Sequence, residues 1–273
     1  MKNRIWLNNK LNLTNDELEI MINTKNSEEE LIELFKIIKS RKEIKYKWDQ
    51  NKSSDGLLGN IFEDLIGIKE NNNRKPDYDN FEIKTKNERS SSSSLISLFG
   101  YSLDCFESVN STIREKYGVD NEKSFLKVFN STIKYSIWNS HRSGYSFKLE
   151  KNCNKLFLKI KNSINNFIVD NDEYFWDINK IDKLFKKIKN SCYVEGEIDK
   201  DKEIVIFKKM IIYKFASIDN FWKLLINGDI TIDFRLGVYN SGKKIGQTHD
   251  HGTTFRIKKS KISELYNYKK EII

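Results

Sequence analysis

Apolar residues recur at helical spacing in several stretches of the chain. The first stretch follows Thr14, and acidic residues occupy its early turns, where the helix dipole favours negative charge. The second begins at Ser27, and Glu30 three residues later predicts a capping box there. The same spacing, with apolar side chains three or four positions apart, predicts further helices over residues 57–66, 178–190 and 217–226.

Other segments read as strands. Their apolar residues alternate with polar ones or form short buried runs, over residues 81–85, 95–106, 155–161, 204–215 and 230–239. The basic stretch 42–48 is expected to form a short strand or an extended arm, and the serine run 90–94 a flexible loop. Because helices and strands interleave, we expect an α/β protein with no clean domain break.

Composition limits the class of protein. The 273 residues suit one large domain or two lobes that share a core, and 38% hydrophobic residues exclude a disordered chain. No apolar run is long enough for a transmembrane helix, and the N-terminus lacks the apolar stretch of a signal peptide. We therefore expect a cytoplasmic protein without a membrane partner. Three scattered cysteines favour neither a disulfide framework nor a zinc site.

The chain carries a formal net charge of +9, from 48 Lys and Arg against 39 Asp and Glu. An excess of positive charge suits a polyanionic partner such as nucleic acid. The lysine-rich, asparagine-rich composition is also what an AT-rich genome produces, so charge alone does not identify the partner. The lysines of the predicted helix 178–190 are expected to form an ordinary solvated face: Lys183, Lys186, Lys187 and Lys189.

The segment from Pro76 to Thr85 carries the strongest chemical signal. Side chains alternate along a strand, so Glu82 and Lys84 point to the same face while Ile83 points into the core. Pro76 favours an extended turn that places Asp77 beside the strand end. Two carboxylates and an ammonium group then converge, and the backbone carbonyl of Ile83 adds a possible ligand.

Such a group suits metal-dependent phosphodiester hydrolysis. Carboxylate oxygens are preferred ligands of Mg²⁺, which activates water and stabilises developing charge, and a lysine stabilises the transition state. The alternative is a solvated strand edge with an ion pair between Glu82 and Lys84. The preceding helix, which carries Glu63, and the apolar residues around the strand favour the catalytic interpretation.

The stretch Gly59 to Gly67, followed by Pro76-Asp77 and Glu82 to Thr85, resembles the active-site region of MutH-like PD-(D/E)xK endonucleases. The resemblance implies that Asp77, Glu82 and Lys84 form the catalytic motif, that Asp77, Glu82 and the Ile83 carbonyl bind metal, and that Glu63 assists. It also implies a restriction-endonuclease-like α/β fold, with a mixed central β-sheet flanked by helices and two lobes around a DNA cleft. We assign residues 1–145 mainly to a catalytic lobe and 146–273 mainly to a DNA-recognition lobe.

A second informative segment lies near the C-terminus. Asp233 and Arg235 share one face of a predicted strand, and Arg256 lies in another strand-like run. Arginine can donate two hydrogen bonds to guanine, and a carboxylate can accept one from cytosine. A surface ion pair is the alternative. The pattern Asp-x-Arg followed by His-Gly-Thr-x-Phe-Arg resembles the base-reading region of the MvaI/BcnI restriction enzymes, which implies that Asp233, Arg235, His251 and Arg256 contact DNA.

Together these features predict a Mg²⁺-dependent type II restriction endonuclease that cleaves double-stranded DNA at a short site flanked by G·C pairs. The resemblance implies a monomer that requires no protein partner. Two alternatives stay open: a MutH-like strand-nicking endonuclease of mismatch repair, and a catalytically idle DNA-binding protein of the same fold. The intact Asp77, Glu82 and Lys84 set argues against the idle protein.

Overall fold

The computed structural model describes residues 11–47, 56–68, 75–88, 95–121, 126–169, 173–239 and 242–273. The chain forms two compact units, each built from separate segments. The first comprises Met1–Ser92, Lys187–Ala216 and Tyr266–Ile273, and the second comprises Ser93–Lys186 and Ser217–Leu265. These units interleave along the sequence, whereas the lobes expected from the sequence divide it near residue 145. The serine run 90–94 lies outside the described residues.

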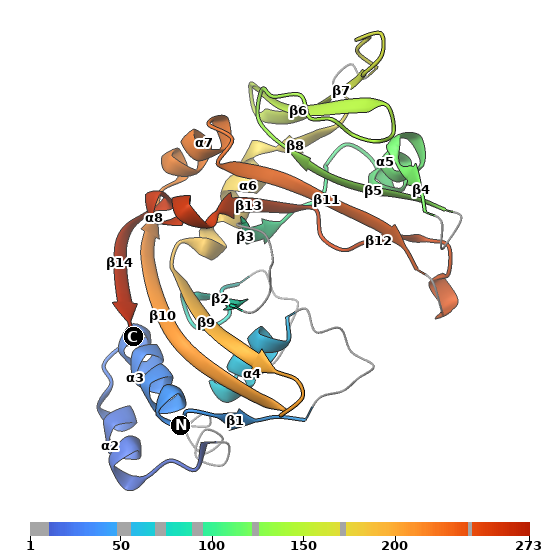
Figure 1. The fold of residues 1–273 in the computed structure, drawn as a ribbon. Coiled ribbons are helices and arrows are strands. Elements are labelled where there is room, and N and C mark those ends of the chain that lie inside the picture. Colours follow the sequence, from blue (N-terminus) through green and yellow to red (C-terminus); the bar gives the residue numbers. More distant parts are fainter. Residues whose placement is uncertain are drawn as a thin grey trace. The chain divides into compact units, whose positions relative to one another are not determined.

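The first unit is a sheet with helices on one face (Figure 1). Its strands follow the order β1 (Ile44–Lys45), β10 (Ile204–Ala216), β9 (Ser191–Asp199) and β2 (Glu82–Asn87), and β14 (Tyr266–Ile272) also pairs with β10. Among the strands that the structure describes in this unit, β2 and β9 pair in parallel and the other pairs are antiparallel. Its helices are α2 (Asn15–Asn23), α3 (Ser27–Ser40) and α4 (Leu57–Leu65).

The helix starts follow local capping chemistry. Thr14 caps α2 and forms a capping box with Glu17, which fits the helix expected after Thr14. Helix α3 begins at Ser27 as expected, but its cap is Asn26, whose side chain accepts from the backbone N–H of Glu29. The predicted capping box of Ser27 and Glu30 is therefore wrong. The Ser27 hydroxyl instead donates to Asp79, 2.5 Å away.

Alternation along the strands divides the sheet of the first unit into two faces. Ile83, Cys192 and Ile212 point to the face that the helices cover, where they join a core with buried residues of α3 and α4. Glu82 and Lys84 occupy the alternate positions of β2 and therefore point to the opposite face. The polar side chains of Glu82 and Lys84 therefore lie together on the face of the sheet that the helices do not cover.

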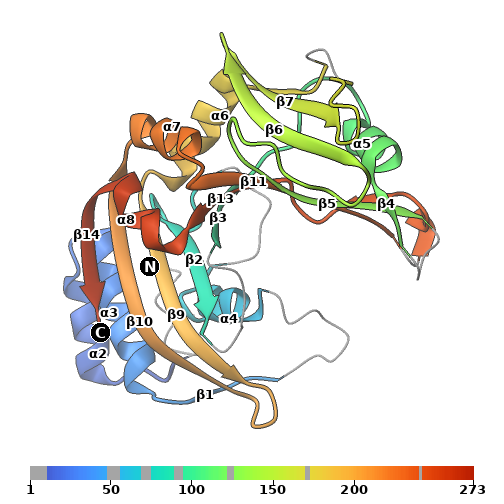
Figure 2. The same ribbon diagram turned by 45° about the horizontal axis from the view of Figure 1, so that its top comes forward.

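The second unit contains two sheets (Figure 2). The larger has the order β3 (Leu95–Gly100), β13 (Thr254–Lys258), β11 (Ile230–Val238), β5 (Lys127–Ile133) and β4 (Val119–Asp120), and β12 (Thr248–Asp250) also pairs with β11. The smaller contains β6 (Tyr145–Asn152), β7 (Lys155–Asn162) and β8 (Phe175–Asp177). The helices are α5 (Val109–Tyr117), α6 (Ile178–Phe185), α7 (Ile218–Ile226) and α8 (Ile262–Leu265).

Aromatic side chains fill the core of the second unit. Phe129 contacts both Phe147 and Phe234 edge to face, and Trp176 packs against Phe234. Because Phe234 alternates with Asp233 and Arg235 along β11, this core covers one face of the larger sheet and leaves polar side chains on the other.

The structure confirms a mixed α/β architecture, with two differences in detail. The strand expected over 95–106 ends at Gly100, because the chain then turns and the backbone N–H of Asp104 bonds to the carbonyl of Phe175. The helix expected over 178–190 ends at Phe185, continues as a 3₁₀ turn at Lys186–Ile188 and gives way to β9. No helix in the described part of the chain has the length and apolar character needed to cross a membrane.

Candidate active site and DNA-reading face

A tight turn positions Asp77 beside the first residues of β2. Tyr78 and Phe81 exchange two backbone hydrogen bonds, and Asp79 between them has a φ of 50°, a left-handed conformation that aspartate tolerates. The turn reverses the chain, so the Asp77 carboxylate accepts a hydrogen bond from the backbone N–H of Ile83 at 3.0 Å. The extended turn expected around Pro76 therefore brings Asp77 to the strand end.

The turn brings the carboxylates of Asp77 and Glu82 together with two lysines. Lys84 Nζ lies 2.6 Å from Glu82 Oε1. Lys187 Nζ lies 3.1 Å from Glu82 Oε2 and 3.6 Å from Asp77 Oδ1. Two carboxylates and two ammonium groups thus form a compact cluster with no formal net charge.

Glu82 is the most deeply buried member of the cluster, with only 3% of its surface exposed. Burial raises the pKa of its carboxyl group, and Lys84 and Lys187 oppose this by favouring the ionised form. Tyr193 and Tyr266, both buried in the same unit, have their own pKa values raised mainly by burial and partly by the nearby Glu82 charge. The carboxylate of Glu82 therefore lies in a poorly hydrated setting where it interacts strongly with cations.

The backbone of Ile83, a residue only 4% exposed, points away from the neighbouring strand β9. The backbone N–H of Glu82 points toward β9, where it bonds to the carbonyl of Asn190. Backbone groups of successive strand residues point to opposite sides, so the N–H and C=O of Ile83 point away from β9, on the side where Asp77 accepts from that N–H. This orientation suits the metal-ligand role that the sequence assigned to the Ile83 carbonyl.

Glu63 lies on the helix-covered side of β2. Its side chain is half-buried in α4, and a Cβ placed on Gly59 would lie 4.0 Å from Glu63 Oε1 and 3.1 Å from the Thr85 hydroxyl. Thr85 points to the face opposite Glu82 and Lys84. Glu63 therefore approaches β2 from the helix layer.

The cluster offers two protein carboxylates to a cation. Glu82 Oε2 is buried without a hydrogen-bond donor, although the Lys187 ammonium lies close to it. Within the described ranges, no group of three His, Cys, Asp or Glu side chains converges on one point. A metal bound by two carboxylates, a carbonyl and water fits this donor set, since Mg²⁺ keeps several water ligands.

The residues expected to read DNA also meet on one sheet face. Asp233 is 1% exposed, and its Oδ2 accepts from Arg235 Nη2 at 3.2 Å and from Arg256 Nη1 at 2.7 Å. The side chains of Arg235 and Arg256 are 51% and 21% exposed. The buried carboxylate thus holds two guanidinium groups that reach the surface from neighbouring strands.

His251 adjoins this group through both backbone and ring. Its N–H bonds to the carbonyl of Arg235 at 2.9 Å. A Cβ placed on Gly237 would lie 3.1 Å from Nε2 of His251, so the imidazole lies against the backbone of β11. Gly237 is two positions beyond Arg235, and the ring therefore lies on the same face as that arginine.

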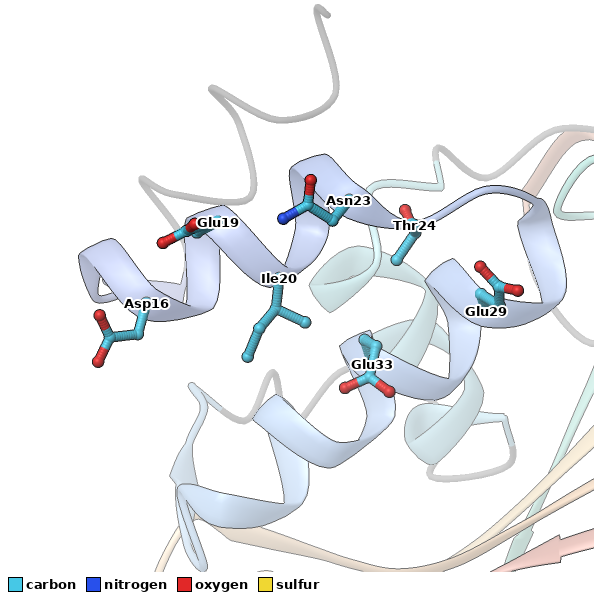
Figure 3. Close-up of a pocket in the computed structure, with 7 residues that line it drawn as sticks. All are labelled: Asp16, Glu19, Ile20, Asn23, Thr24, Glu29 and Glu33. Atoms are coloured by element: carbon cyan, nitrogen blue, oxygen red, sulfur yellow. The ribbon is translucent and has the colours of Figure 1, made fainter.

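A separate pocket lies between α2 and α3, lined by Asp16, Glu19, Ile20, Asn23, Thr24, Glu29 and Glu33 (Figure 3). Its charged side chains are all acidic. It belongs to the helix layer, on the other side of the sheet from Glu82. Neither lysine of the Asp77–Glu82 cluster reaches it, and we assign it no chemistry.

Comparison of the sequence with known protein families gives a match over most of the chain. Residues 32–266 match the family model of the MvaI/BcnI restriction endonucleases. The chain belongs to this family. Its activity is therefore that of a type II restriction endonuclease, an enzyme that hydrolyses phosphodiester bonds in DNA. Restriction endonucleases of this kind generally use a divalent metal.

Solved structures support the same assignment. A complex of restriction endonuclease MvaI with its cognate DNA is 26% identical, with a TM-score of 0.78 over 92% of this chain and all of that chain. MvaI in the absence of DNA is 23% identical, with a TM-score of 0.56 over 92% of this chain and 99% of that chain, and shows the fold. A search of curated proteins finds no match.

The sequence did not predict that Lys187 joins Asp77, Glu82 and Lys84 in the active-site cluster of the endonuclease. Lys187 was interpreted as part of a solvated lysine face, and its contacts with Asp77 and Glu82 show that interpretation to be wrong. The helix ends two residues before Lys187, so this lysine does not share a face with Lys183. About 100 residues separate it from the motif, and no local pattern indicates the contact.

Proposed function

We propose that this restriction endonuclease uses Mg²⁺ bound by Asp77, Glu82 and the carbonyl of Ile83. The observation that carries the proposal is the convergence of the Asp77 and Glu82 carboxylates at the start of β2, with the Lys84 ammonium 2.6 Å from Glu82. When bound, Mg²⁺ lowers the pKa of a water ligand and polarises the scissile phosphate. The protein's own contribution is to fix the two carboxylates and exclude bulk water around Glu82.

Lys84 acts on the reacting groups. Its ammonium lies on the same strand face as Glu82 and can orient the attacking water or stabilise charge on the phosphate. Glu63, which approaches β2 from the helix side, would assist the site as an additional carboxylate. Asp77, Glu82 and Lys84 form the catalytic group, and Glu63 supports it.

The second unit supplies recognition. Arg235 and Arg256 donate paired hydrogen bonds to guanine, and His251 contacts a neighbouring base. Asp233, which is buried, fixes the planes of both guanidinium groups and so contributes to reading chiefly through them. These residues fit a short duplex site flanked by G·C pairs, bound by a monomer without a protein partner.

The test is digestion of unmethylated plasmid DNA with Mg²⁺, followed by sequencing of the ends. We expect double-strand breaks at one short sequence with G·C pairs at its borders, and no cleavage when EDTA removes the metal. Breaks at unrelated sequences would refute the recognition proposal. Nicks confined to GATC would support the MutH-like alternative, and the absence of any cleavage would support the idle protein.

A further inference from the structure

The four carboxylate oxygens of Asp77 and Glu82 divide into two pairs. One oxygen of each residue is engaged locally: Asp77 Oδ2 accepts from the Ile83 N–H, and Glu82 Oε1 contacts Lys84. The remaining oxygens, Asp77 Oδ1 and Glu82 Oε2, both face the ammonium of Lys187, at 3.6 and 3.1 Å. These two oxygens are the ones left for a metal ion to take.

Lys187 differs from Lys84 in how it is held. Lys84 projects from β2 itself, two positions from Glu82, so the strand fixes its place. Lys187 reaches the carboxylates from the 3₁₀ turn Lys186–Ile188, and 22% of its side chain is exposed. A lysine ammonium is a compact charge on a flexible four-carbon stem, and it can leave an ion pair for water at low cost.

We propose that Lys187 is a built-in cation that occupies the metal position of the metal-free enzyme and is displaced when the divalent ion binds. The proposal rests on the proposed metal site. Without metal, the Lys187 ammonium keeps Asp77 and Glu82 from repelling each other and preserves their spacing. The ion and the ammonium compete for the same two oxygens and repel each other, so metal binding favours the withdrawal of Lys187. Lys187 is thus a positioning residue that sets the metal affinity.

The test compares metal affinity in Lys187→Gln and wild type, with Mn²⁺ as the probe and electron paramagnetic resonance reporting free ion without DNA. Glutamine keeps a hydrogen-bond donor and removes the charge. A charge within 4–6 Å of an ionisable group changes that group's affinity for a proton by roughly one to three powers of ten. For the affinity of the carboxylates for Mn²⁺ we expect an effect at the lower end of this range, because the Lys187 side chain is partly exposed to solvent. We therefore expect Lys187→Gln to bind Mn²⁺ about tenfold more tightly.

Lys186→Gln is the matched control, because Lys186 belongs to the same 3₁₀ turn and is exposed. It should bind Mn²⁺ like the wild type, and Lys187→Arg, which retains the charge, should lack the gain seen with glutamine. Thermal unfolding gives a second measurement. Without metal, Lys187→Gln should melt below the wild type, and added Ca²⁺ should raise its melting temperature more than that of the wild type.

Unchanged or weaker Mn²⁺ binding by Lys187→Gln would overturn the proposal. If that variant does not fold, Lys187→Met is titrated instead, with the same expectation. Glu82→Ala separates this inference from the proposed function. If wild type and Glu82→Ala bind Mn²⁺ equally, the metal site itself is wrong, whereas loss of binding in Glu82→Ala with no gain in Lys187→Gln rejects only the role of Lys187.

Discussion

At the scale of single residues, Glu82 illustrates how an active-site residue of the endonuclease can lower the free energy of unfolding. Its carboxyl group is buried, and burial raises its pKa above the ordinary value of 4.5 despite the contacts with Lys84 and Lys187. The folded protein therefore prefers the protonated form more than the unfolded chain does. Ionisation of Glu82, which binding of a cation requires, therefore makes the folded protein less stable relative to the unfolded chain.

Replacing Glu82 with glutamine should therefore stabilise the metal-free protein at neutral pH. The sign follows from linkage: a raised folded-state pKa means that ionisation of Glu82 lowers stability as pH rises from about 4.5 through the raised value, and the loss persists above it. Thermal unfolding without metal should show Glu82→Gln melting above the wild type at pH 8 and near it at pH 4.5.

The exposed Glu43 provides a control, since Glu43→Gln should leave the melting temperature unchanged at both pH values. A Glu82→Gln variant that melts below the wild type at pH 8 would show that the ion pairs with Lys84 and Lys187 outweigh the cost of burial.

The arginines of the second unit carry a different prediction. If Arg235 and Arg256 each read a guanine, alanine at either position should cost about 1–3 kcal/mol in binding to the cognate duplex. Binding to random duplex should change much less, because phosphate contacts and salt dominate there. Fluorescence anisotropy on both duplexes, with Ca²⁺ to prevent cleavage, measures the difference. Equal losses on the two DNAs would make these arginines phosphate contacts.

At the scale of secondary-structure elements, close packing of α4 against the sheet positions β2. Gly196 of β9 lies where Leu58 of α4 meets the sheet, and a Cβ there would lie 2.7 Å from the backbone carbonyl of Ile206 and 3.3 Å from Leu58. A backbone atom cannot move aside as a flexible side chain can. The helix that carries Glu63 thus depends on the absence of a side chain at Gly196.

Gly196→Ala should destabilise the protein by about 1–3 kcal/mol, the usual cost of overpacking a close contact. Gly100→Ala is the matched control: Gly100 also lies in a strand, but its nearest neighbour would be 3.7 Å away, an ordinary contact. Urea denaturation compares the free energies of unfolding. Equal stability of the two variants would show that β9 and β10 shift easily, which would contradict the close packing at Gly196.

Patterns of apolar residues within one short segment were enough to predict helices and strands. The amphipathic spacing of residues 57–66 and the alternation of 81–85 indicated α4 and β2, and the convergence of Asp77, Glu82 and Lys84 followed from strand geometry. Contacts between distant segments could not be predicted in this way. The pairing of Lys187 with the carboxylates depends on how β9 adds beside β2, and nothing in the sequence around Asp233 indicates its burial.

At the scale of the whole molecule, the two chemical tasks fall in different units. Asp77, Glu82, Lys84 and Lys187 all belong to the first unit, whereas Asp233, Arg235, His251 and Arg256 all belong to the second. With the roles proposed for these residues, cleavage belongs to the first unit and recognition to the second, although neither unit is a continuous stretch of sequence. That the two groups line one cleft, as the family resemblance implies, stays a prediction.

The separation of cleavage from recognition is tested most directly with Asp77→Ala and Glu82→Ala, by measuring cognate-site cleavage in Mg²⁺ and cognate-site binding in Ca²⁺ for each variant. We predict that both variants lose cleavage and keep specific binding, because the two carboxylates hold the metal and the bases are read by the other unit. Cleavage at the wild-type rate in either variant would contradict the assignment of the active site.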